Sequence, residues 1–221
     1  MRAKSALIVI AKALLLLASW GVVGYAIVAY GTKPAGATVH PEMMKAFQAN
    51  LPVVYAHVFG SAVALILGPL QFSKRLRAKA PAVHRVLGRA YLFLGVGVGG
   101  VAGLWMSTFA YGGLTGRLAF ATLAVLWLVS AALALRAILR RDIAAHKRWM
   151  IRNFALTFSA VTLRIMLGTS FALDLPFGVA YPVIAWICWP PNLLVAEWII
   201  RRSAGGGAGW RRGAGAGGGV K

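Results

Sequence analysis

Acidic residues are almost missing from this sequence: four aspartates and glutamates stand against 24 lysines and arginines in 221 residues. Charged residues of either sign make up 13% of the chain, whereas a soluble domain carries about 25%. The single cysteine, Cys188, excludes an intrachain disulfide and a cysteine metal cluster. The scarcity of charge therefore excludes a soluble globular domain of ordinary composition.

Hydrophobic residues take the place of the missing charge and make up 60% of the chain. They recur in runs of about 18 residues or more, which is the length of a membrane-spanning helix. The sequence therefore predicts an all-α integral membrane bundle of six transmembrane helices, over residues 5–30, 51–72, 86–110, 118–135, 154–175 and 179–200.

The intervening segments divide the chain into a transmembrane domain and a tail. The first helix is too long and too weakly punctuated for a cleaved signal peptide. Residues 31–50 are marked by glycine and proline and form the longest loop, with a short helix at 41–48. Residues 1–200 are expected to form the six-helix domain, and the Gly/Ala-rich residues 201–221 a disordered cytoplasmic tail.

The cationic residues are distributed very unevenly between the two sides of the membrane in this six-helix arrangement. Of the 24, 19 fall in the N-terminus, the second and fourth loops and the tail, and three fall on the opposite side. Cytoplasmic loops of membrane proteins carry such an excess of lysine and arginine. We therefore expect a bacterial inner-membrane protein with both termini in the cytoplasm. Topology explains the net charge of +20 without a nucleic-acid partner, and the bilayer is the expected partner.

A polar stripe runs along the fifth helix and the basic segment before it. His146, Asn153, Thr157 and Arg164 span 18 residues, or five turns at about 3.6 residues per turn, so they share one face. Because polar groups are costly against lipid, we expect this face to point into the bundle.

Two histidines at the cytoplasmic side carry a redox hypothesis. His84 opens the third helix and His146 precedes the fifth, so facing imidazoles could ligate a b-type haem as its two metal ligands. The face below His84 carries Gly88, Tyr91 and Gly95, where small residues give either close helix packing or room for a flat ring. Arginine side chains would pair with the haem propionates. The expected cofactor-binding residues are His84, His146, Arg85, Arg89, Arg148 and Arg152.

A polar interior supports a different hypothesis. Arg164 lies about 18 Å along the helix axis from Arg152, deep in the membrane, and needs a partner. The candidates are carbonyls freed in the sixth helix by Pro190 and Pro191, Asp174, or a substrate anion. The expected interior residues are His57, Gln71, Asn153, Thr157, Arg164 and Asn192.

Two further side chains have simpler expected surroundings. Glu197 lies near the cytoplasmic charges, where Arg85, Arg89 or Arg152 would neutralise it. His40, beside Glu42 in the longest loop, is expected to be solvated.

Several short motifs resemble a bacterial family of predicted membrane proteins catalogued as a domain of unknown function, number 2306. The likeness covers about residues 50–200 and is carried by 57–60, 68–72, 84–91, 146–152, 162–164 and 189–193. This resemblance implies a membrane location and no established activity. A looser resemblance is to six-helix transmembrane cytochromes b, in which histidines on helices three and five ligate one haem and those on two and four another. The fourth helix here has no histidine, which departs from the second of these sites.

Three functions therefore remain open. The first is a haem protein that takes part in electron transfer with an unknown redox partner. The second is a non-redox transporter or binding protein for a small molecule, with a helix interrupted at its site. The third is a structural subunit with neither cofactor nor cavity. A cavity joining the interior polar residues would favour the second of these functions.

Overall fold

A computed structural model of the chain describes residues 2–34 and 36–213. All regular structure in these residues is helical, and six helical segments are long and apolar enough to cross a membrane. These spans are Val9–Gly31, Leu51–Gln71, Pro81–Ser107, Gly113–Leu139, Ile143–Ala172 and Phe177–Ser203. The expected all-α bundle of six spanning helices is confirmed.

Several spans are built from more than one helix. The elements are α1 (Arg2–Gly31), α2 (Pro41–Ala49), α3 (Leu51–Gln71), α4 (Lys74–Lys79), α5 (Pro81–Ala90), η1 (Tyr91–Val98), α6 (Gly99–Ser107), α7 (Gly113–Leu139), α8 (Ile143–Thr157), α9 (Ser159–Ala172), α10 (Phe177–Ile187) and α11 (Pro190–Gly213). The third span joins α5, the π-helical η1 and α6, the fifth joins α8 and α9, and the sixth joins α10 and α11.

The helices extend beyond the apolar runs into the basic segments. The third span begins at Pro81 instead of residue 86, and the fifth at Ile143 instead of residue 154. Lysine and arginine are good helix formers whose long stems reach back to the interface, so hydropathy does not mark these helix ends. The side chains of Ser73 and Asp142 cap α4 and α8 by accepting hydrogen bonds from backbone N–H groups. At the other end of the chain α11 continues through Gly213, and residues 214–221 of the expected tail lie outside the described residues.

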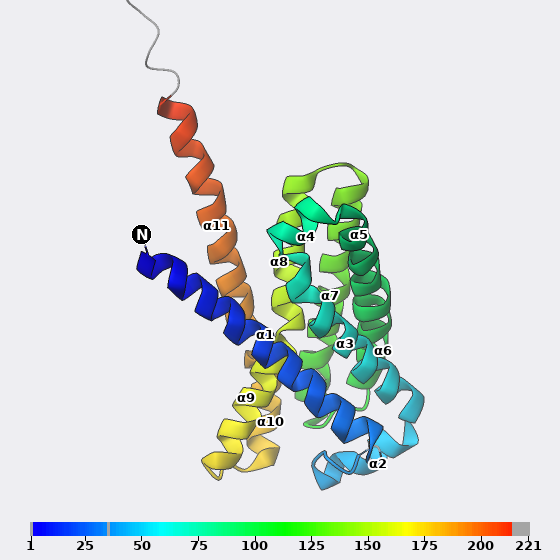
Figure 1. Cartoon of the computed structure of the whole chain (residues 1–221). Coiled ribbons are helices and arrows are strands. Elements are labelled where there is room, and N and C mark those ends of the chain that lie inside the picture. The colour runs from blue at the N-terminus through cyan, green and yellow to red at the C-terminus, as the bar shows by residue number, and fades with distance from the viewer. Residues whose placement is uncertain (1, 35, 214–221) are drawn as a thin grey trace, which may run out of the picture.

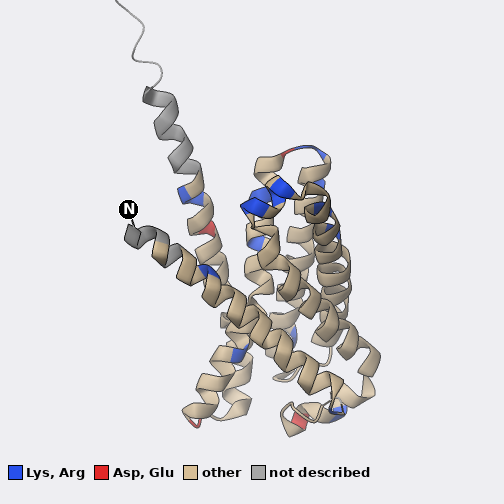
Figure 2. Ribbon diagram, in the orientation of Figure 1, with Lys and Arg blue, Asp and Glu red and all other residues tan. Residues whose placement is uncertain are grey.

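The bundle has two chemically different ends (Figure 1). The basic end carries α4, the start of α5 and the turn between α7 and α8, and its lysines and arginines gather there (Figure 2). The opposite end carries α2 and the turn between α9 and α10. The long α1 crosses obliquely in front of the other helices between these ends.

Helix α3 packs unusually closely against both η1 and α6. A Cβ atom on Gly60 would lie 2.7 Å from the backbone nitrogen of Gly99, closer than real Cβ atoms come. One on Gly95 would lie 3.0 Å from the Cβ of Ala64. The glycines expected in this span therefore serve close helix packing.

The fifth and sixth spans are both interrupted near mid-length. Thr157, Ser159 and Thr162 each donate a side-chain hydrogen bond to a carbonyl one turn earlier, around the break at Phe158. Back-bonding of this kind bends helices. The sixth span breaks at Cys188 and Trp189, directly before Pro190 and Pro191, because proline has no N–H to continue the helix but fits its first turn.

Candidate functional site

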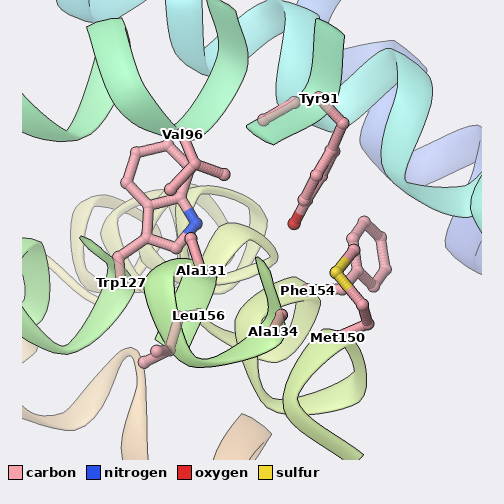
Figure 3. Packing of buried hydrophobic residues seen from close by; sticks show 9 residues of the cluster. Tyr91, Val96, Trp127, Ala131, Ala134, Met150, Phe154 and Leu156 are labelled. Carbon is pink, nitrogen blue, oxygen red and sulfur yellow. The ribbon is translucent and has the colours of Figure 1, made fainter. Parts of the chain in front are cut away.

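A buried hydrogen-bond network joins η1, α7 and α8. Tyr91 and Trp127, two of its members, also belong to the hydrophobic cluster in Figure 3. The Tyr91 hydroxyl donates to Asn153 Oδ1 at 2.6 Å and lies 2.9 Å from Thr157 Oγ1. Trp127 Nε1 donates to Thr157 Oγ1 at 2.9 Å, and Asn153 Nδ2 donates to the Trp127 carbonyl and to Ser130 Oγ, each at 2.8 Å. The network therefore gives each of these polar side chains a partner away from lipid.

This network explains part of the polar stripe on the fifth span. Asn153 and Thr157 are 0% and 5% exposed, and both face inward. Sequence analysis missed their partners Tyr91, Trp127 and Ser130, because these lie on other helices, η1 and α7. The detectable signal was a tyrosine and a tryptophan far from either end of an apolar helix, where their polar atoms need a buried partner.

A central cavity of about 570 Å³ lies beside the network, toward the opposite end of the bundle. Helices α1, α2, α3, α6, α7, α8, α9 and α10 all contribute to its wall, together with the segment before α2. Most of the lining is aliphatic or aromatic. The polar lining residues include His57, Thr157 and Arg164 from the expected interior set.

Arg164 is the cation of the central cavity. Its Nη1 donates to the carbonyl of Ala160 in its own helix at 2.8 Å, and its guanidinium carbon lies 5.6 Å from the ring centroid of Tyr25. Within the described residues, no aspartate or glutamate forms an ion pair with it. The carbonyls freed in the sixth span and Asp174, both expected as partners, do not bind it. A guanidinium has five N–H donors, and this one uses Nη1 on a backbone carbonyl, so it can also bind an anion in the cavity.

Phenol groups line the same cavity and were not expected as site residues. They belong to Tyr25 and Tyr30 on α1 and Tyr181 on α10. Their signal in the sequence was three tyrosines inside otherwise apolar spans. They give the cavity hydrogen-bonding groups without further charge.

An aromatic cluster closes the cavity's wall near α2. His40 stacks on Phe177 with ring centroids 4.0 Å apart, and Tyr111 lies 5.1 Å from Phe177. His40 is half-buried and lines the cavity, so its expected solvated position is wrong: the stack covers one face of its ring. A hydrogen bond to the Glu42 carboxylate raises the pKa of Tyr111 above its ordinary value, because the carboxylate disfavours a phenolate beside it.

Two members of the expected polar interior lie elsewhere. Gln71 is 6% exposed at the basic end, and Asn192 donates to Thr162 Oγ1 at 3.0 Å and to the Cys188 carbonyl at 3.3 Å. Asn192 thus supplies a donor at the break in the sixth span. Neither side chain lines the central cavity. Gln71 shares a face of the unbroken α3 with His57, but 14 residues, or about 21 Å along the helix axis, separate the two.

His84 and His146 both lie at the basic end of the bundle. His146 Nδ1 lies 2.9 Å from the Ala134 carbonyl of α7, which accepts its hydrogen. His84 Nδ1 is buried and has no partner in the described chain. Neither ring lines the central cavity.

The interior near the basic end is filled by apolar side chains. Tyr91, Met150 and Phe154 belong to one hydrophobic cluster with Ala134 and are 0%, 7% and 6% exposed (Figure 3). The space beside the glycines that would accommodate a flat ring is filled by residues of α3. This packing gives no support to the haem hypothesis.

The arginines expected at haem propionates have other positions. Arg152 forms a two-point ion pair with Glu197, with Nε to Oε1 at 2.5 Å and Nη2 to Oε2 at 3.0 Å. This contact ties α8 to α11 and agrees with the neutralisation of Glu197 expected from the sequence. Arg85, Arg89 and Arg148 are exposed at the basic end.

Comparison with known proteins gives the chain a family. A model of the family described as predicted membrane protein, DUF2306, matches residues 54–200. No curated protein and no solved structure matches the chain. The matched range includes His57, the buried network, Arg164 and both helix breaks, and it confirms the resemblance found in the sequence. The chain therefore belongs to the DUF2306 family of predicted membrane proteins.

Proposed function

We propose that this chain is a multi-pass protein of the bacterial inner membrane that binds, and by alternating access transports, a small amphipathic anion in its central cavity. Both termini and the basic end lie in the cytoplasm. The observation that carries this proposal is Arg164, a membrane-embedded cation that lines a cavity and has no carboxylate partner among the described residues.

The energetics of a buried charge favour a ligand at this position. A charged side chain at the centre of a membrane helix costs at least about 2.5–3.5 kcal/mol, and intramembrane cations normally pair inside the protein. Arg164 has a backbone carbonyl and an aromatic ring instead. An anion that binds the guanidinium would supply the missing counter-charge.

The shape and lining of the cavity define the class of ligand. Its volume of about 570 Å³ is within the range of small-molecule sites, which are mostly apolar with a few polar anchors. An apolar portion of the ligand would contact residues such as Leu163, Leu167 and Phe171, and its anionic group would contact Arg164. This pattern favours an organic monoanion with a short apolar tail.

The interrupted helices support transport over static binding. Discontinuous helices near the membrane midplane are a common feature of transporter sites. Both breaks border the cavity, since Leu156, Thr157 and Ser159 line it on one side and Cys188 on another. A purely structural subunit would have no use for such a cavity.

Octanoate and the neutral alcohol octanol are matched probes for this proposal. Wild-type protein in phosphatidylcholine nanodiscs is expected to bind octanoate in calorimetric titrations and to unfold at a higher temperature when octanoate is present. Octanol, with the same tail and no charge, should bind at least about tenfold more weakly. Empty nanodiscs correct for partition into lipid.

Substitution of Arg164 tests the anchor directly. Arg164→Gln should weaken octanoate binding by about ten- to a hundredfold, the typical value of a hydrogen bond to a charged group. Because Arg164 pairs with no carboxylate in the described chain, the variant should unfold at an equal or higher temperature than the wild type. Arg117→Gln, at an exposed arginine of α7, is the matched control and should bind normally. Wild-type affinity in Arg164→Gln, or equal affinity for octanol, would contradict the proposal.

A further inference from the structure

His57 is held in one orientation by the helix opposite it. Its Nδ1 lies 2.8 Å from the carbonyl oxygen of Gly99, which can only accept, so Nδ1 carries the hydrogen. A Cβ atom on Gly103 would lie 2.7 Å from this nitrogen, so the glycine makes room for the ring. In the neutral imidazole, Nε2 is then a hydrogen-bond acceptor with a free lone pair.

The free nitrogen belongs to the central cavity. His57 lines that cavity, and its Nε2 has no hydrogen-bond partner in the part of the chain that the structure describes. This nitrogen is not fully buried and retains accessible surface. The cavity therefore presents both a cation at Arg164 and an acceptor at His57.

An anion and a neutral His57 are poorly matched neighbours, since both offer lone pairs. We propose that the anion binds together with one proton, which His57 takes up at Nε2 and then donates in a hydrogen bond to the anion. The inference rests on the proposed function and deepens it: the protein couples the uptake of an organic anion to a proton. The proton comes from water, and no bond of the ligand is made or broken.

Electrostatics couple the two binding events. In the empty cavity the charge of Arg164 disfavours a second positive charge on His57, because like charges repel strongly where water is scarce. A bound anion offsets that repulsion and favours the protonated ring. By linkage, protonation then favours the anion to the same extent. The incoming anion and proton are together neutral, which lowers the cost of carrying them through the membrane.

Other titratable groups around the cavity are few. They are Tyr25 and Tyr30 on α1, His40 before α2, Arg164 on α9, Tyr181 on α10 and Cys188 at the break after α10. His146 provides the matched control, because its Nδ1 is also held by a backbone carbonyl, that of Ala134, but its ring does not line the cavity.

Calorimetric titration in buffers of different ionisation enthalpy measures the protons taken up per ligand. The probe is octanesulfonate, which stays anionic throughout the range, so any proton taken up must reside on the protein. At a pH where His57 is neutral in the empty protein, the wild type should take up close to one proton per octanesulfonate. Its affinity should fall by up to about tenfold per pH unit as the pH rises.

Two variants locate the proton. His57→Asn keeps an amide donor for the Gly99 carbonyl but has no group that titrates, so its uptake should fall to near zero and its affinity should become independent of pH. His146→Asn keeps an amide donor for the Ala134 carbonyl and lies outside the cavity, so it should take up protons as the wild type does. Persistent uptake in His57→Asn, or loss of uptake in His146→Asn alone, would overturn the assignment. Wild-type binding that needs Arg164 but takes up no proton would overturn the coupling while the proposed function stands. Failure of the wild type to bind either octanoate or octanesulfonate would overturn both.

Discussion

Thr157 is the residue where the buried network and the central cavity meet. Its hydroxyl accepts from Trp127 Nε1, lies in hydrogen-bond contact with the Tyr91 hydroxyl, and donates to the Asn153 carbonyl one turn earlier. The side chain also contributes to the cavity wall. One hydroxyl thus joins three helices at the point where the fifth span bends.

Thr157→Val removes this hydroxyl and keeps the shape of the side chain. The free energy of unfolding should fall by about 1–3 kcal/mol, because Trp127 Nε1 would remain buried without an acceptor. Titration of purified protein with a denaturing detergent measures the change. Thr157→Ser keeps the hydroxyl and should cost less than half as much. Equal losses in the two variants would show that the methyl group matters and the network does not.

Arg152 and Arg164 differ in the kind of partner that their charge finds, and only the partner of Arg152 was predictable from the sequence. Each needs a partner because each charge lies near the membrane. Arg152 has the carboxylate of Glu197, a pairing that the shared side of the membrane made predictable. Arg164 has Ala160 and Tyr25, and the identity of these contacts depends on how α1 crosses the bundle.

The contact between helices α3 and α6 sets the position of His57. Backbones approach so closely at Gly60 and Gly99 that a side chain on either has no space. This approach places the Gly99 carbonyl within reach of His57 Nδ1. Small residues at this interface therefore position the proposed proton acceptor as well as packing two helices.

Gly60→Ala should force these two helices apart. The new methyl group would meet the Gly99 backbone, which cannot rotate away, so the free energy of unfolding should fall by about 1–3 kcal/mol. Gly24→Ala is the matched control, since a Cβ there meets nothing within 4 Å. It should leave stability unchanged or raise it by up to about 1 kcal/mol through helix propensity. Detergent unfolding of both variants distinguishes packing from propensity, and similar values for the two would contradict a close α3–α6 contact.

Only some of the irregularities in the spanning helices were expected from the sequence. The break before Pro190 was expected, because proline removes a backbone donor whatever surrounds it. The break at Phe158 and the π-helical η1 have no proline, and they were not expected. Back-bonding by Thr157 and Ser159 accompanies the first of these, and it depends on side-chain rotamers that tertiary contacts select.

The whole molecule is polarised by charge along its length (Figure 2). Lysines and arginines gather at the basic end, and the central cavity extends from mid-bundle toward the other end. In the proposed orientation the cavity therefore lies in the outer half of the membrane. The buried network and the cluster around Tyr91 and Phe154 lie between the cavity and the basic end.

Cysteine labelling tests this orientation. Cys188 is 0% exposed, so a Cys188→Ser background removes the native thiol at a buried position. In that background, a membrane-impermeant maleimide should label Lys45→Cys on α2 in intact cells and Lys79→Cys on α4 only after the cells are broken. Both native lysines are exposed, so the two sites differ in their side of the membrane and not in burial. The reverse labelling pattern would contradict cytoplasmic termini.

The sequence by itself determined the six spans, their all-helical structure and the family, because hydropathy and charge act locally along the chain. It also placed His57, Asn153, Thr157 and Arg164 inside the bundle, since the cost of polar groups in lipid permits no other position. The tertiary structure alone decided which of these residues meet in one cavity. It brought in Tyr25, Tyr30 and Tyr181, and it moved Gln71 and Asn192 away. These choices depend on how broken helices cross, and helix crossing is set by long-range packing of side chains that no local pattern records.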